Sequence, residues 1–225
     1  MAAARRAEFM DVWLLLGGFC VLAAAVLGMW FWETARLPDN VGRTLTMAET
    51  VEVIGRNSPL TQYVRLSTSA DFPREEEISK ITIHHMAGDL SLEKVGEIFG
   101  ERDRRTSANY GIDSDGRVGL YVEECNRPWS SKSKENDSRA VTIEVANDQI
   151  GDDWHVSDAA YETLIDLCVD ICQRNGIPEL VYTGDGEGSL TLHKMFYSET
   201  ECPGPYLESK IPEIVYTVNT RLREA

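Results

Sequence analysis

The chain has 225 residues and a formal net charge of −15, from 37 acidic and 22 basic side chains. This balance excludes nucleic acid as a partner, because phosphate binding requires clustered Lys and Arg. It also argues against long-range attraction to an anionic polymer, so affinity for such a substrate would have to come from local contacts. Five irregularly spaced cysteines do not make a disulfide framework.

An uncharged apolar run covers residues 12–32. A helix of this length, at about 1.5 Å per residue, would cross the ~30 Å hydrocarbon layer of a membrane. Two arginines precede the run and two tryptophans lie at its far end, which favours a cytoplasmic segment at 1–11 and an extracytoplasmic body. The alternative is a cleaved signal peptide, whose apolar region is normally shorter. We predict a single-pass transmembrane anchor at 12–32, a polar linker at 33–57 and a catalytic domain at 58–225.

The first half of this body carries strand, helix and hairpin signals in turn. Residues 80–84 alternate and are rich in β-branched side chains, which predicts a strand. Residues 91–99 begin with a serine cap and place apolar side chains on one face, which predicts a helix. Residues 109–112 and 118–122 flank an Asp-Ser-Asp-Gly turn and are predicted to form a β-hairpin.

The second half of the body continues the alternation of strands and helices. Residues 140–146 and 180–183 are predicted strands, and residues 157–175 carry the three- and four-residue apolar spacing of a long helix. Cys168 and Cys172 share a face of that helix and are interpreted as small core residues rather than as a metal or redox pair. This order predicts an α/β fold with a mixed β-sheet flanked by helices.

Three side chains have the donor atoms that zinc prefers. His84 lies at the end of a predicted strand, His193 follows Leu-Thr-Leu, and Cys202 lies nine residues beyond His193, directly before Pro-Gly-Pro. A catalytic zinc site uses three protein ligands from imidazole, thiolate or carboxylate groups and leaves one position for water. Scattered histidines also arise by chance, so these three residues alone only suggest a metal site.

The short motifs around these residues form an ordered series. They are ITIHHMAG at 81–88, SANYGI at 107–112 followed by Asp115-Gly116, VTIEV at 141–145, and His193 followed by CPGPYL at 202–207. The series resembles the zinc-dependent N-acetylmuramoyl-L-alanine amidases, a family that includes phage endolysins and peptidoglycan recognition proteins. It looks most similar to endolysin-type amidases of clostridial phages. The resemblance covers about residues 58–221, nearly the whole body.

The resemblance implies that His84, His193 and Cys202 hold a Zn²⁺ ion. The first histidine of the pair matches the family's ligand, and we expect His85 to point to the other side of the strand because successive side chains alternate. The interval from His193 to Cys202 is one residue longer than in the commonest members, with residues 197–201 as the place of the addition.

The resemblance also implies catalytic and substrate-binding residues. Glu144 matches the catalytic carboxylate; a structural salt bridge is the alternative, since an isolated Glu on a buried strand is costly. Thr200 matches a position occupied by Lys or Thr and would donate a hydrogen bond to the developing oxyanion. Asn109 and Trp129 match positions near the substrate groove, and for Trp129 a packing role is the alternative.

The implied reaction is the hydrolysis of peptidoglycan at the amide between N-acetylmuramic acid and L-alanine. A zinc-activated water would attack this bond, with Glu144 as general base. The expected partners are peptidoglycan and, through residues 12–32, a membrane. A receptor of the same fold that binds muropeptides without cutting them, a cysteine peptidase that uses Cys202, and a structural zinc site are the alternatives.

Overall fold

A computed structural model describes residues 37–225, of which residues 39–225 form one compact unit. The predicted anchor at 12–32 and the segment at 1–11 lie outside the described residues. None of the helices in residues 37–225 combines the length and the apolar composition that a membrane span requires. The helices and strands, in chain order, are α2 (Met47–Gly55), β1 (Thr61–Val64), β2 (Ala70–Asp71), β3 (Lys80–His85), α3 (Leu92–Gly100), η1 (Arg102–Arg104), β4 (Tyr110–Ile112), β5 (Val118–Leu120), β6 (Arg127–Pro128), α4 (Lys134–Arg139), β7 (Ala140–Val145), α5 (Asp158–Asn175), β8 (Leu190–Leu192), η2 (His193–Met195) and α6 (Gly204–Glu224).

A six-stranded mixed sheet lies at the centre, with the strand order β1-β5-β4-β7-β3-β8. The β4–β5 pair is antiparallel and forms the predicted hairpin, whereas the other neighbours are parallel. Strands β2 and β6 form a separate two-stranded sheet. This architecture confirms the predicted α/β fold with a mixed sheet.

The central strands have one apolar face and one polar face because successive side chains alternate. The side chains that join the main hydrophobic core are Ile81, Ile83, Val141, Ile143, Val145, Leu190 and Leu192. Those that alternate with them are Thr82, His84, Thr142, Glu144 and Thr191. On this polar face the Thr82 and Thr191 hydroxyls are 2.9 Å apart. The sheet therefore separates the hydrophobic core from a face that presents polar and ionisable side chains.

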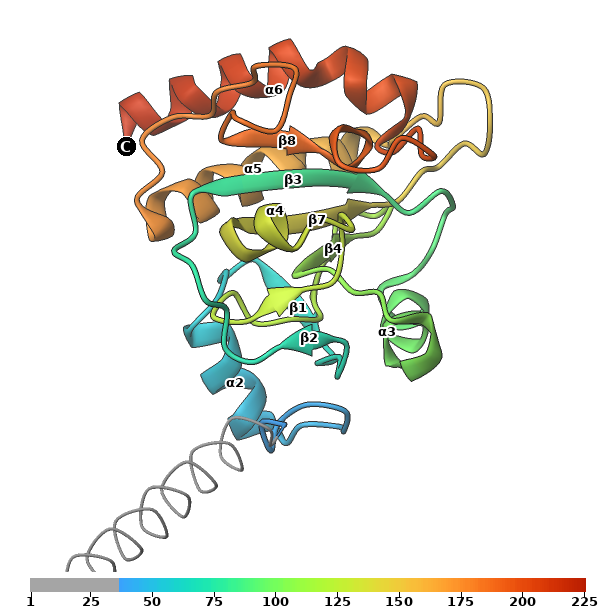
Figure 1. The fold of residues 1–225 in the computed structure, drawn as a ribbon, viewed down its shortest axis with the longest axis vertical. Coiled ribbons are helices and arrows are strands. Elements are labelled where there is room, and N and C mark those ends of the chain that lie inside the picture. The colour runs from blue at the N-terminus through green and yellow to red at the C-terminus, as the bar shows by residue number, and fades with distance from the viewer. Residues whose placement is uncertain (1–36) are drawn as a thin grey trace, which may run out of the picture. The chain divides into compact units, whose positions relative to one another are not determined.

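Helices α5 and α6 pack side by side and cover the apolar face (Figure 1). Helix α5 is capped at its N-terminus by Ser157, whose hydroxyl accepts from the Ala160 amide, and at its C-terminus by Gly176, which has a left-handed backbone. Cys168 and Cys172 are fully buried thiols on this helix, which confirms their interpretation as core residues.

The segment predicted as a linker contributes to the compact unit from Asp39 onward. Within it, Thr46 and Glu49 form a capping box that starts α2. Val53 of this helix is buried in the main core. Residues 39–57 are thus packed against the body, which differs from the predicted domain start at residue 58.

The strand predicted at residues 180–183 is wrong. The main-chain N–H and C=O of Leu180 bond to the Asn219 side chain, and Val181 is exposed. The strand at this edge is β8, in which Leu190 and Leu192 are fully buried. The segment lies beside β8, because the Leu190 amide donates to the Val181 carbonyl at 3.0 Å, but the amides of Leu180 and Val181 donate to side chains. A short apolar run is therefore ambiguous from sequence.

Candidate metal centre

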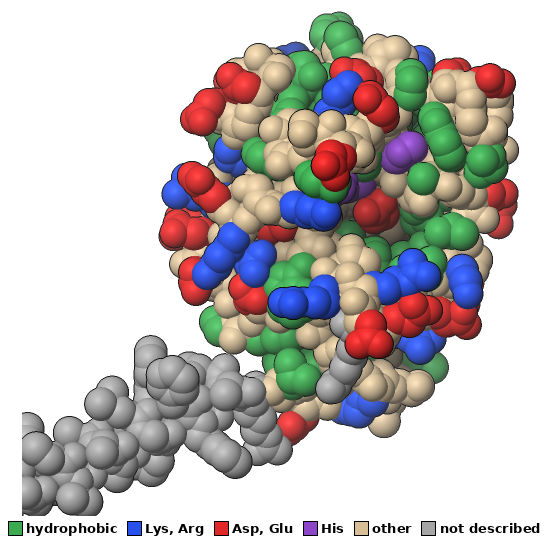
Figure 2. All heavy atoms as spheres, turned by 45° about the vertical axis from the view of Figure 1, so that its right-hand side comes forward, with side chains coloured by type: hydrophobic (Ala, Val, Ile, Leu, Met, Phe, Trp, Pro, Cys, Tyr) green, Lys and Arg blue, Asp and Glu red, His purple; other side chains and the backbone are tan. Residues whose placement is uncertain are grey.

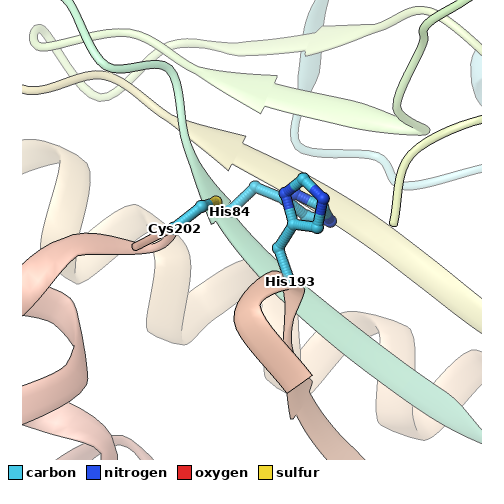
Figure 3. A group of neighbouring side chains, drawn as sticks. All are labelled: His84, His193 and Cys202. Carbon is cyan, nitrogen blue, oxygen red and sulfur yellow. The ribbon is translucent and has the colours of Figure 1, made fainter. Parts of the chain in front are cut away.

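The predicted metal ligands meet at the carboxyl-terminal ends of β3 and β8. His84 lies in β3, and His193 follows β8 directly, in the register that pairs Ile83 with Leu192. By the alternation of side chains, both histidines project from the polar face. Cys202 reaches the same place from the turn before α6 (Figure 3).

The ligand atoms of His84, His193 and Cys202 all lie within 4.8 Å of one another. The two imidazole rings are 4.7 Å apart between centroids. His85 is not part of this cluster: its ring packs edge-on against Trp154, with the ring centres 5.2 Å apart. The structure thus brings together the three residues that the sequence selected.

The protonation states of these side chains suit a divalent metal ion. Burial holds the pKa of His84 well below its ordinary value and lowers that of His193 to about 4, so both imidazoles are neutral at pH 7. The Nε2 atom of His193 is buried and has no hydrogen-bond partner among the described residues. A buried polar atom without a partner is costly unless something else occupies its lone pair. Two neutral imidazoles and one thiol fit a zinc ion.

Local hydrogen bonds hold Cys202 in place. The Cys202 amide donates to Thr200 Oγ1 at 3.2 Å, and its carbonyl accepts from the Lys194 amide at 3.0 Å. Its sulfur accepts from the His85 amide at 3.4 Å. Burial, together with the charge of Glu144, raises the pKa of the thiol well above its ordinary value. A nearby cation would be needed to hold it as a thiolate at neutral pH.

Glu144 is the register partner of His84 and lies beside it on the polar face. One of its carboxylate oxygens is 3.8 Å from Nδ1 of His84, and its side chain is 20% exposed. This contact is not an ion pair because His84 is neutral, and Glu144 has no Lys or Arg partner among residues 37–225. Desolvation raises the pKa of Glu144 to about 8. The structural salt bridge considered as an alternative is therefore absent from the described part.

The other predicted site residues fare differently. Thr200 lies next to the cluster through its bond to Cys202. Trp129 is half-buried and lines a pocket with Arg105, whose guanidinium carbon is 5.6 Å from the indole centroid. Asn109 is fully buried, and its amide group bonds to the backbone of Val122 and Thr142. The Asn109 side chain therefore stabilises the fold, and none of its atoms is exposed to a substrate.

Two further residues shape the centre and were not predicted. The Ser130 hydroxyl lies 3.0 Å from Nε2 of His84. An Nε2 proton donated to Ser130 would leave the Nδ1 lone pair free for a metal. Gly111 on β4 is the register partner of Glu144, and the side chains of Tyr121 and Met86 occupy the space that a Cβ at Gly111 would enter. Figure 2 shows a hollow in which histidine and acidic side chains are exposed.

Solved structures share this fold. A hydrolase, AmiA, from Staphylococcus aureus in complex with its ligand has a TM-score of 0.56 and 14% identity, over 83% of this chain and 95% of that one. The N-acetylmuramoyl-L-alanine amidase LysC from Clostridium intestinale has a TM-score of 0.53 and 19% identity, over 71% and 99%. The structure of PlyL has a TM-score of 0.51 and 15% identity, over 74% and 91%.

The sequence itself identifies the family. No curated protein matches the chain. The family model described as N-acetylmuramoyl-L-alanine amidase matches residues 74–205, more than half of the chain. This stretch contains the polar face of the sheet and the whole candidate metal centre. On this match, and with the fold that the solved amidase structure shares, the chain belongs to the N-acetylmuramoyl-L-alanine amidase family.

Proposed function

We propose that this protein is a zinc-dependent peptidoglycan amidase that hydrolyses the bond between N-acetylmuramic acid and L-alanine. The observation that carries the proposal is the grouping of His84, His193 and Cys202 beside Glu144 on the polar face of the sheet. Membership of the amidase family supports the class of reaction.

His84, His193 and Cys202 would hold the metal. Ser130 occupies one ring nitrogen of His84, and the buried Nε2 of His193 has no other partner among the described residues. When bound, zinc would polarise the scissile carbonyl and acidify a water molecule. The three protein donors leave one position for substrate or water, which distinguishes this set from a closed structural site.

Glu144 would act as the general base and then as the general acid. It would take a proton from the attacking water and return it to the leaving amine of L-alanine. A buried carboxyl with a pKa of about 8 exchanges protons readily near neutral pH. The Glu144 side chain is 20% exposed, so a substrate can reach the carboxylate. Thr200, whose oxygen accepts from the Cys202 amide, keeps its hydroxyl proton for the developing oxyanion.

A cysteine peptidase is the less favoured reading of the same residues. A nucleophilic cysteine needs a lowered pKa, whereas burial raises the pKa of Cys202. A muropeptide receptor without activity would need neither an open metal position nor a carboxylate of raised pKa beside it. The membrane anchor at 12–32, and with it the extracytoplasmic position of the domain, stays a prediction.

The test is product analysis on purified cell walls with the full-length, zinc-loaded protein. We expect new L-alanine amino ends, no new reducing sugar ends, loss of activity on chelation and recovery with zinc. Glu144→Gln should retain zinc and lose at least about 100-fold in rate. Glu201→Gln, which removes a side chain that is 88% exposed, is the matched control and should keep its activity. New reducing ends, or an active Glu144→Gln variant, would contradict the proposal.

A further inference from the structure

A pocket of about 370 Å³ lies beside the metal centre. Its lining consists of the indole of Trp129, four cations and two carboxylates: Arg105, Arg127, Lys132, Lys134, Asp71 and Asp137. The neighbouring residue, Ser130, contacts His84. Figure 2 shows Lys and Arg side chains around the hollow that exposes histidine. A cationic pocket at this position is unexpected in a chain with a net charge of −15.

Two of these cations are already neutralised within the protein. Arg127 donates from Nε to Asp71 at 2.8 Å, and Lys134 lies 3.2 Å from Glu75. Arg105 and Lys132 are exposed and make no ion pair with any residue that the structure describes. Both face aromatic rings instead. The Asp137 carboxylate accepts from the backbone amides of Ser130 and Ser131. Arg105 and Lys132 are therefore the two cations of the pocket that have no carboxylate partner in the described part of the chain.

The backbone at both free cations is strained. Arg105 has a φ of 48° and Lys132 a φ of 62°, in the left-handed region that side chains other than glycine rarely adopt. Backbone strain of this kind gathers at functional sites. The loops thus hold these two cations at the pocket against their local backbone preference.

Lys132 links the pocket to the metal centre. Its ammonium lies 3.9 Å from the ring centre of Tyr197, and that ring stacks on His193 with 6.2 Å between centres. The ammonium is therefore within about 10 Å of the His193 ring, a span that two to three extended peptide residues cover. A group on the second or third residue of a peptide whose first amide is cut at the centre can reach the pocket.

We propose that this pocket binds a free carboxylate on the peptide of the substrate, held by Lys132 and Arg105 beside the wall formed by Trp129. This inference rests on the proposed amidase function and adds a specificity to it. A carboxylate matches two unneutralised cations, whereas a carboxamide at the same place would leave both unpaired. The pocket would make the enzyme select peptides by charge close to the bond that it cuts.

The experiment uses two N-acetylmuramoyl tripeptides that differ only at the second residue, which carries a free carboxylate or a carboxamide. With the full-length, zinc-loaded protein, we expect kcat/KM to favour the carboxylate by about tenfold or more. Lys132→Met should reduce this preference to about twofold by slowing only the carboxylate substrate, and Lys132→Arg should restore most of it. Lys94→Met, which removes an exposed cation paired with Glu97, is the control and should keep the wild-type preference.

Equal losses on both substrates in Lys132→Met, or no loss on either, would overturn the proposal. So would stronger competition by a glycerol phosphate polymer than by the carboxylate peptide. If the wild-type protein cuts neither tripeptide, the affinity for each tripeptide, measured by calorimetry, tests the pocket separately from the amidase activity. Tighter binding of the carboxylate tripeptide, lost in Lys132→Met, would support the carboxylate pocket even without hydrolysis. Equal binding of the two tripeptides would contradict it.

Discussion

Replacing Glu144 with glutamine is expected to make the metal-free protein more stable while it abolishes hydrolysis. The carboxyl is desolvated, has no cationic partner in the described chain and lies beside neutral His84. Its negative charge is therefore unfavourable in the folded protein when no metal is bound. Glutamine has the same shape and removes this charge.

The size of the effect follows from the pKa of Glu144, which rises from an ordinary 4.5 to about 8 on folding. At about pH 7.5 this shift costs at most about 4 kcal/mol, at roughly 1.4 kcal/mol per pKa unit. The glutamine amide also loses hydration, so we expect a net gain of about 1–3 kcal/mol. At about pH 4 the carboxyl is largely protonated in both states, and the gain should nearly vanish. It should grow as the pH rises from 4.5 towards 8.

Urea unfolding in the presence of a chelator, at about pH 4 and about pH 7.5, measures this difference. A gain of 1–3 kcal/mol corresponds to a rise in Tm of several degrees for a domain of this size. Glu201→Gln removes an exposed carboxylate next to Cys202 and should change stability by less than about 0.5 kcal/mol. Equal stability of Glu144→Gln and wild type at about pH 7.5, or the same gain at both pH values, would refute the reasoning.

Three other substitutions test the centre and the sheet that supports it. Ser130→Ala should weaken zinc binding about 10- to 100-fold in a chelator competition, because His84 loses the partner of its Nε2; unchanged affinity would remove Ser130 from the site. Cys202→Ser should weaken zinc binding more than Ser130→Ala in the same titration, since it replaces a soft thiolate donor by a hydroxyl. Ile143→Ala, on the apolar face, should cost about 2–5 kcal/mol in urea unfolding yet leave the zinc affinity of the folded protein within about threefold.

Much of the fold was predictable because several of its helices and strands have a clear periodicity of apolar residues in the sequence. The strand at 80–84, the hairpin and the helix at 157–175 each have their own periodicity and end signals, and the structure has β3, β4–β5 and α5 there. The edge strand β8 was missed because three residues are too few for a period. Helix α6 was not predicted, and Pro212 inside it interrupts the usual helical signal.

The metal ligands of the candidate site were predictable because their residue types and the motifs around them are visible in the sequence. The three predicted ligands lie together because parallel strands bring distant segments to one edge. Ser130 and Lys132 could not be predicted, since they act from a loop whose path no periodic pattern describes. Asn109 shows the opposite case: the structure gives it backbone bonds within the fold, which a motif cannot distinguish from a place in the groove.

The longer interval between His193 and Cys202 need not disturb the metal centre. The hydrogen bond from the Lys194 amide to the Cys202 carbonyl, 3.0 Å long, joins the two ends of the loop. His193 is fixed by β8, and Cys202 is fixed by the amides of His85 and Lys194, which lie outside residues 197–201. An added residue between these anchors can change the path of 197–201 without moving either ligand, because a surface loop tolerates insertions at small free-energy cost. Thr200 is the exception, since it lies within that loop, and the direction in which its hydroxyl proton can point depends on the loop path.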